Sequence, residues 1–207
     1  MHRFKTARAL ALAGFALLIA SNTAPAQQPE MVRVRGTIEK IDGSVMTVKA
    51  RDGAMLTIKL AENLRVLGLV KIPLADIKPG AYVGVSSVPI PGGGLKALHV
   101  HQFLEAMRGV AEGHRGHDTA PQAMMTNATL AEVVAVTGGQ TLLLKYKDGE
   151  QKILVPPEAQ IVAYVPGDRA ELKPGTPMMI FAAAKQPDGT LAAANVTVGR
   201  DGLVPPM

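Results

Sequence analysis

Hydrophobic and polar residues alternate along most of the chain after residue 31, in short runs separated by glycine-containing turns. A period of two is typical of strands that are buried on one side. Asp42-Gly43 and Asp52-Gly53 are dipeptides of the kind that closes β-hairpins. They predict a meander of three short strands over 32–60, and later turns separate two further strands, 82–88 and 95–103.

The second half of the chain repeats the turns of the first half. Asp148-Gly149 follows Asp52-Gly53 at an offset of 96, and Lys173-Pro174-Gly175 follows Lys78-Pro79-Gly80 at an offset of 95. Turns that arise independently seldom keep one offset. We therefore infer that the chain contains an internal duplication.

Each half has about 70 residues and five or six short strands. A sheet of this size with one hydrophobic face is most stable when it closes on itself, because closure removes its exposed edges. We predict an all-β fold of two tandem OB-like β-barrels, 31–103 and 128–199, with a pair of small sandwiches as the alternative. Helical structure is expected only as single turns, at 74–77, 105–108 and 170–172.

The segment 104–127 belongs to neither half. A connection longer than about 12–15 residues without secondary structure is uncommon in compact domains and is usually functional or disordered. This segment is not of low complexity, because charged residues and histidines are mixed with three glycines. We predict an ordered linker that joins the two barrels and folds back on one or both of them.

The N-terminus has the three parts of a secretory signal peptide. A basic stretch over 3–8 precedes an apolar run over 9–20, and Ala24-Pro25-Ala26 supplies a small-residue cleavage motif. The apolar run has 12 residues, whereas a membrane-spanning helix needs about 20. We predict that 1–26 is removed by cleavage after Ala26, which leaves a periplasmic or secreted protein with no transmembrane helix.

Composition excludes several classes of function. The leader holds three of the 22 lysines and arginines and none of the 17 acidic residues, so its removal lowers the net charge from +5 to +2. A nearly neutral chain with 3% aromatic residues lacks the basic face and stacking rings of nucleic-acid-binding proteins. The absence of cysteine excludes disulfides, a thiolate nucleophile and cysteine-based metal sites. The expected partner is an unknown periplasmic protein or a small ligand.

Four of the five histidines lie between residues 99 and 117. His99 and His101 are two residues apart in a predicted strand, so both side chains project to the same side. The duplication aligns them with Asn195 and Thr197, residue types that suit a solvent-facing side. We therefore expect both imidazoles to point outward, with Val100 on the opposite side.

His114 and His117, three residues apart in the linker, could complete a metal site with His99 and His101. Imidazole suits Zn²⁺ and Cu²⁺, and the nearby methionines would favour Cu(I). The spacings match no recognised zinc motif. Four surface or hydrogen-bonding histidines are therefore the alternative interpretation.

The linker also carries residues suited to ordering a glycine-rich segment. Arginine donates five hydrogen bonds, and several carboxylates stand close to Arg108 and Arg115 in the sequence. Such contacts would satisfy backbone groups and hold the two barrels in a fixed relation. The predicted binding or ordering residues are Glu105, Arg108, Glu112, His114 and Asp118.

Catalysis is the least favoured interpretation of the same residues. Glu112, His114 and Asp118 could form an acid–base set, since a histidine positioned by a carboxylate is a common arrangement. The serines at 86 and 87 lie in a predicted strand rather than in a strained turn after a Gly-x-Ser-x-Gly motif. We assign no catalytic residue, and a hydrolase is the weakest candidate.

The run from Glu105 to Asp118, followed by Met125-Thr126-Asn127-Ala128, resembles a family of exported bacterial proteins with duplicated OB-like β-domains of unknown function. His114 matches the pattern of this family, whereas the family has a Pro-Trp pair where this chain has Gly116-His117. Some members carry the label metal ABC transporter permease, but a permease needs many spanning helices. The resemblance implies a periplasmic OB-like duplicate and no particular activity.

These observations together predict a non-catalytic periplasmic binding or scaffold protein, with its partner or ligand at the junction of barrel and linker. The alternative is a periplasmic protein that binds Zn or Cu through the four histidines.

Overall fold

The computed structural model describes residues 29–206. Within this range the protein consists of strands and single turns of 3-10 helix, which confirms the predicted all-β class. The helical turns are η1 (Leu74–Asp76), η2 (Glu105–Met107) and η3 (Arg169–Glu171), at the three predicted places. None of the helical turns in residues 29–206 is long or apolar enough to cross a membrane. The predicted signal peptide lies outside the described residues.

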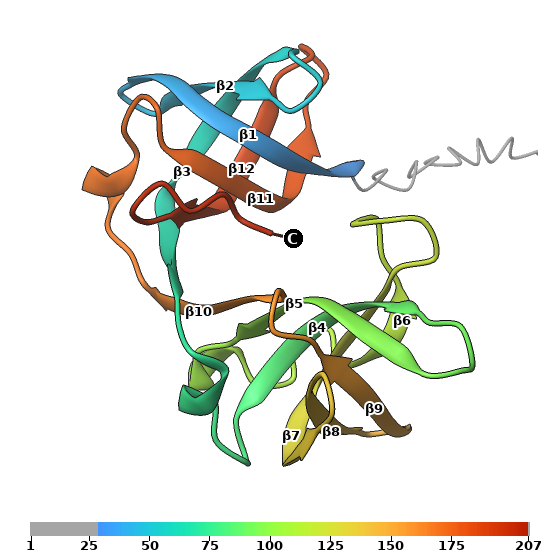
Figure 1. Ribbon diagram of the computed structural model, residues 1–207. Coiled ribbons are helices and arrows are strands. Elements are labelled where there is room, and N and C mark those ends of the chain that lie inside the picture. The colour runs from blue at the N-terminus through green and yellow to red at the C-terminus, as the bar shows by residue number, and fades with distance from the viewer. Residues whose placement is uncertain (1–28, 207) are drawn as a thin grey trace, which may run out of the picture.

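One five-stranded barrel, which we call the split barrel, is built from both ends of the chain (Figure 1). Hydrogen-bonded pairs run from β1 to β2, β3, β12, β11 and back to β1. Its strands are β1 (Met31–Asp42), β2 (Val45–Ala50), β3 (Met55–Lys71), β11 (Pro177–Lys185) and β12 (Leu191–Gly199).

A second ring of strand pairs, which we call the inserted ring, is formed by the middle of the chain. The pairs run from β4 to β7, β8, β9, β5 and back to β4, and the β5–β9 step contains two residue pairs. The short strand β6 pairs with β7 outside this ring. The strands are β4 (Tyr82–Pro89), β5 (Leu95–Gln102), β6 (Gly113–Gly116), β7 (Met124–Val136), β8 (Gly139–Tyr146) and β9 (Gly149–Val155).

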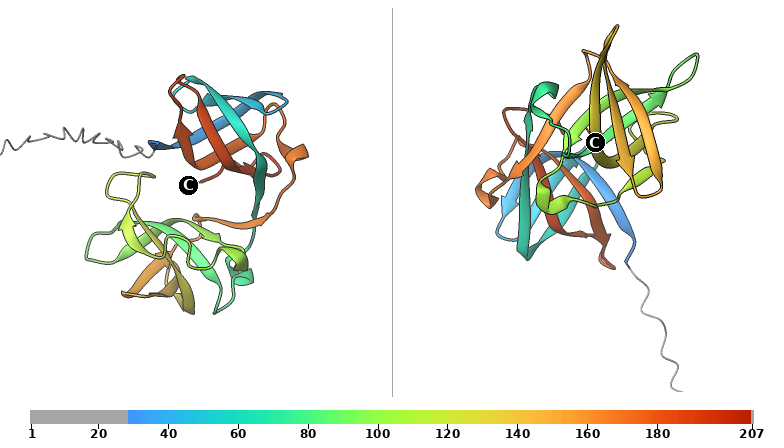
Figure 2. Two further views of the ribbon diagram at one scale, coloured as in Figure 1. Left: turned by 180° about the vertical axis from the view of Figure 1, so that it is seen from behind. Right: turned by 90° about the horizontal axis from the view of Figure 1, so that it is seen from below.

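Strand β10 (Gln160–Pro166) connects the two rings into one sheet. It pairs antiparallel with the end of β3 and parallel with the end of β5. Figures 1 and 2 show the two rings as separate lobes, with β3 and β10 crossing between them.

This connectivity corrects the predicted domain boundaries. Neither barrel is the contiguous half 31–103 or 128–199, because the split barrel combines 31–71 with 177–199 and the inserted ring spans 82–155. The segment 104–127 therefore does not join two barrels; it connects β5 to β7 within one ring. Alternation predicts a strand and its buried face, but it does not specify the neighbouring strand, since ladder hydrogen bonds form equally between segments distant in sequence.

Three hydrophobic clusters follow from this arrangement. One fills the split barrel around Ile38, Met46 and Ile58, and another fills the inserted ring around Val100 and Leu142. The third lies between the two lobes, at a place that we call the junction. Its buried members are Leu69, Tyr82, Phe103, Val162, Tyr164, Met179 and Leu203.

Candidate functional site

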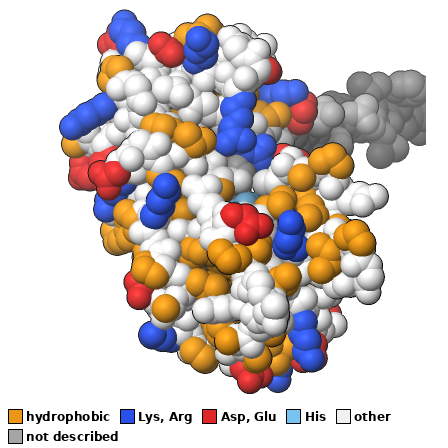
Figure 3. Space-filling view, in the orientation of Figure 1, with side chains coloured by type: hydrophobic (Ala, Val, Ile, Leu, Met, Phe, Trp, Pro, Cys, Tyr) orange, Lys and Arg blue, Asp and Glu red, His pale blue; other side chains and the backbone are white. Residues whose placement is uncertain are grey.

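The junction is the place where the two lobes meet, and His101, one of the residues that the sequence singled out, packs there against Phe103 and Tyr164. The junction receives side chains from β4, from Phe103 directly after β5 and from β10 on the inserted side, and from β3, β11 and the tail after β12 on the other. The connection from residue 104 to 123, which we call the clasp, lies beside it. Figure 3 shows Lys and Arg side chains facing this region, with a histidine visible between the two lobes.

The two strand histidines project away from the core of the inserted ring but are not exposed. Val100 is fully buried in the core of the inserted ring, so His99 and His101 lie on the other side of β5, as the alternation predicts. Each of them is only 2% exposed. The expectation of a solvent-facing pair is wrong, because the outer side of β5 is covered at the junction, where β5 also pairs with β10.

The two imidazoles pack among aromatic rings. The centroids of the His99 and His101 rings are 5.7 Å apart, and His101 meets Phe103 and Tyr164 edge-on at 4.7 and 5.8 Å. Burial, followed by the charges of His117 and Arg35, lowers the pKa of His99 to about 3. Burial also holds the pKa of His101 well below its usual range. Both imidazoles are therefore neutral near pH 7.

Four buried polar atoms around these histidines have no hydrogen-bond partner in the described part of the chain. They are Ser87 Oγ, His99 Nε2, His101 Nδ1 and Asn127 Oδ1. More than nine in ten buried polar groups in folded proteins are satisfied, so an orphaned group requires an explanation such as a water or a ligand. All four lie on β4, β5 and β7, which are neighbouring strands.

The clasp histidines contact threonine hydroxyls. His114 Nδ1 lies 2.8 Å from Thr126 Oγ1, and His117 Nδ1 lies 3.0 Å from Thr119 Oγ1. Thr119 in turn hydrogen-bonds to the buried Ser86 hydroxyl at 2.6 Å. Burial, with the nearby charge of Arg33, lowers the pKa of His117 to about 4.

These contacts give the four-histidine metal site no support. No three His, Cys, Asp or Glu side chains within residues 29–206 are grouped so that they could hold a metal ion. The candidate acid–base set is likewise dispersed. Glu112 Oε1 accepts from Lys147 N, while His114 contacts Thr126 and Asp118 pairs with arginines.

Asp118 ties the clasp to the split barrel. Its carboxylate accepts two hydrogen bonds from Arg35, at 2.8 and 3.0 Å, and one from Arg33 at 2.5 Å. These partners lie 83 and 85 residues away in sequence, on β1. The hydrogen bonds from Arg35 and the charge of Arg33 hold the pKa of Asp118 well below its usual range, so it stays ionised.

Arg108 organises the beginning of the clasp. Its guanidinium binds both carboxylate oxygens of Glu105, at 2.6 and 2.7 Å, and also donates to the Gly80 carbonyl and the Thr129 hydroxyl. It lies over the Tyr82 ring, 5.8 Å from the centroid. Its hydrogen bonds lower the pKa of the Glu105 carboxyl. One side chain thus connects the clasp to β4, β7 and the turn before β4.

Several residues of this site escaped the sequence interpretation. Arg33 and Arg35 read as ordinary outward strand positions, with no sign of a partner in the clasp. Tyr82 and Asn127 both donate to the Val110 carbonyl at 3.1 Å and so fix the middle of the clasp. The sequence has only three tyrosines and four phenylalanines, and three of these seven residues, Tyr82, Phe103 and Tyr164, lie in the junction. The few aromatic positions were therefore the available sequence signal for this site.

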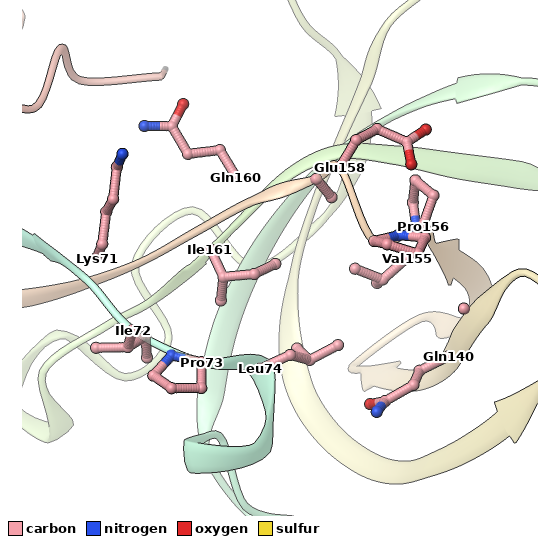
Figure 4. A pocket seen from close by; sticks show the side chains of 13 residues that line it. Lys71, Ile72, Pro73, Leu74, Gln140, Val155, Pro156, Glu158, Gln160 and Ile161 are labelled. Atoms are coloured by element: carbon pink, nitrogen blue, oxygen red, sulfur yellow. The ribbon is translucent and has the colours of Figure 1, made fainter.

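A separate pocket of about 660 Å³ lies where the chain enters and leaves the inserted ring. Its lining includes Ile72, Leu74 and Ile161 (Figure 4). Lys71 at the end of β3 and Gln160 at the start of β10 also belong to the lining. The lining also includes the charged residues Lys71 and Glu158, so the pocket combines an aliphatic surface with charges of both signs.

Comparison of the chain with protein-family models, with curated proteins and with solved structures found no match.

Proposed function

We propose that the chain is a non-catalytic binding or scaffold protein of the periplasm or extracellular space, built from two OB-like barrels that arose by duplication. The clasp holds the two lobes in one arrangement, and a partner protein or small ligand binds at the junction. The leader sequence supports export, and the strand connectivity supports the duplication.

The register of β3 with β10 fits a duplication in which equivalent strands meet. The pairs run from Lys71 opposite Val162 to Leu67 opposite Pro166. A sequence offset of 96 relates Leu67 of β3 to Ala163 of β10 and Val70 to Pro166. The two strands therefore pair with each other as equivalent strands of two copies related by a twofold axis would. On this proposal each barrel takes three strands from one copy and two from the other.

The single observation that carries the scaffold proposal is the bridge from Asp118 to Arg33 and Arg35. It joins a residue of the clasp to the first strand of the split barrel. A surface ion pair contributes little by itself, but bidentate arginine–carboxylate geometry within a network contributes more. Arg108, Tyr82 and Asn127 fix the other part of the clasp to the inserted ring. The clasp is thus anchored on both lobes.

Arg108→Ala tests the clasp. We expect its melting temperature to fall by roughly 2–4 °C. We also expect faster proteolysis within 104–123, because the backbone there loses its attachment to Gly80 and Thr129. Limited proteolysis followed by mass spectrometry locates the cut.

Arg200→Ala is the matched control. Arg200 also binds a carboxylate with two hydrogen bonds, to Glu171 at 2.8 and 2.9 Å, and donates to a backbone carbonyl, but none of these partners is in the clasp. The Arg200→Ala variant should have a lower melting temperature but no faster proteolysis within 104–123. Equal clasp proteolysis in the two variants, or none in either, would contradict the proposed role.

A further inference from the structure

Two arginines of the split barrel bind one carboxylate, and the charge of that carboxylate also acts on a third arginine. Arg33 and Arg35 bind Asp118 directly. Arg51 follows β2 and donates to the Pro205 carbonyl at 3.0 Å. The charges of Arg35 and Asp118 both act on Arg51, the first lowering and the second raising its pKa after the larger effect of burial. The four side chains therefore share one electrostatic environment.

The contact has the geometry by which proteins recognise small anions. Arg35 presents a planar fork to both oxygens of the carboxylate, and such bidentate pairs are specific for carboxylate and phosphate groups. The Arg35 side chain is 17% exposed, whereas Asp118 is 52% exposed. The donors are thus sheltered while the acceptor lies toward solvent, from where another anion can take its place.

A second observation is a buried polar atom without a hydrogen-bond partner. His99 is 2% exposed, and its Nε2 atom has no partner within residues 29–206. After the larger effects of burial and of His117, the charge of Arg35 also lowers the pKa of the His99 imidazole. A buried polar atom without a partner loses its hydrogen bond to water and gains none, which a bound oxygen would correct.

We propose that the junction binds a small anionic ligand with a carboxylate or phosphate group, held by Arg33 and Arg35 at the position that Asp118 fills in this structure. Asp118 then acts as an internal stand-in for the ligand. His99 supplies a neutral hydrogen-bonding group beneath the anion, and Arg51 adds positive charge. This inference rests on the proposed binding function and assigns its ligand class.

An internal carboxylate makes the apparent affinity of the native protein low. A site that is filled by Asp118 for most of the time binds an external anion in proportion to the fraction of time that it is vacant. Removal of the charge of Asp118 should therefore increase binding, which is the reverse of what loss of an ordinary binding residue does.

The test is calorimetric titration of succinate and, separately, of inorganic phosphate into the protein without residues 1–26, at constant ionic strength in chloride. We expect Asp118→Asn to bind at least one of the two anions about tenfold more tightly than the native protein, because the competitor is removed. The two arms distinguish a carboxylate site from a phosphate site. Adding Arg35→Ala to Asp118→Asn should abolish the gain.

Asp188→Asn is the matched control. Asp188 pairs with Lys59 at 2.6 Å and is 53% exposed, so its removal changes the net charge equally at a site with one cation in place of the arginine pair. It should bind anions no better than the native protein. An equal gain in this control, no binding of either anion by Asp118→Asn, or a gain that survives Arg35→Ala would overturn the anion site.

The same variants separate this inference from the clasp. The melting temperature of Asp118→Asn without added anion reports the contribution of Asp118 to the clasp. A lower melting temperature without anion binding would support the structural role of the clasp and refute the proposed ligand class. Anion binding with an unchanged melting temperature would support the ligand class and refute the contribution of Asp118 to the clasp. Circular dichroism establishes that each variant is folded, and Asp118→Ala serves in place of the asparagine variant where that fails.

Discussion

Each lobe has a cross-strand residue pair that can be compared with one in the other lobe, because the paired residues lie 95 and 96 positions apart in the sequence. On the inserted ring, Gly84 of β4 stands opposite His101 of β5. On the split barrel, Met179 of β11 stands opposite Thr197 of β12. Each pair places a large side chain opposite a smaller residue, and His101, Met179 and Thr197 are all at most 3% exposed. The same pair of positions in two ladders thus accommodates an imidazole over a glycine in one lobe and a thioether beside a threonine in the other.

Glycine is required at position 84 because the His101 ring occupies the place of a side chain. A Cβ atom there would lie 2.1 Å from His101 Nε2 and 2.7 Å from Asn127 Oδ1. Gly84→Met, which copies the larger residue of the other lobe, should therefore cost about 3 kcal/mol or more. Chemical denaturation measures this as a lower midpoint, or as loss of the folded state.

The comparison predicts a specific rescue. Gly84→Met combined with His101→Thr copies the Met179–Thr197 pair and should recover much of the lost stability. Gly116→Ala is the control, since no atom lies within 4 Å of a Cβ atom at that position, and it should change the midpoint little. Failure of the double variant to improve on Gly84→Met would show that the two pairs are not equivalent.

The histidines also make the stability of the inserted ring depend on pH, whereas Met179 and Thr197 of the split barrel do not titrate. Burial lowers the pKa of His99 to about 3 and that of His101 well below 6.5, and the pKa of His117 is lowered to about 4. The unfolded chain binds protons near pH 6.5 and the folded chain does not. Stability is therefore complete above about pH 6.5 and is lost as the pH falls toward 4, by up to about 1.4 kcal/mol per pH unit for each histidine.

His99→Asn with His101→Thr transfers the residues of the other lobe, Asn195 and Thr197, to β5. We expect the free energy of unfolding of this variant to depend less steeply on pH between 6.5 and 4, whatever its absolute stability at neutral pH. Urea denaturation at a series of pH values gives the slope. A slope equal to that of the native protein would assign the acid sensitivity to other groups.

The sequence predicted local features and failed where distant segments meet. The Asp-Gly hairpins and the three helical turns lie where their residues indicated, because turn chemistry acts over a few residues. The side of β5 that carries His99 was also predicted, but its burial was not, since burial depends on β10. The bridge from Asp118 to Arg33 spans 85 residues, and neither residue carries a local sign of the other. The assignment of strands to barrels failed for the same reason.

The two lobes also close differently along their parallel strands. β12 pairs with β3 over eight residue pairs, whereas β5 pairs with β9 over two and then with β10 over four. β3 is continuous over 17 residues, while Pro156-Pro157 separates β9 from β10. Proline lacks the backbone N–H that a ladder needs, which accounts for the gap in the inserted ring.

Replacement of Pro156-Pro157 by Leu-Ala copies Leu60-Ala61, the residues 96 positions earlier. The change removes two rigid residues from the unfolded chain and so should cost no more than about 1 kcal/mol for each proline. It should also let β9 continue along β5 beyond Lys96, which hydrogen exchange would detect as slower exchange of the amides between Ala97 and His99. Unchanged exchange there would mean that the crossing of β10 to β3, and not the prolines, keeps the inserted ring open. The short β5–β9 pairing of the inserted ring would then be a consequence of how β10 pairs with β3 at the junction.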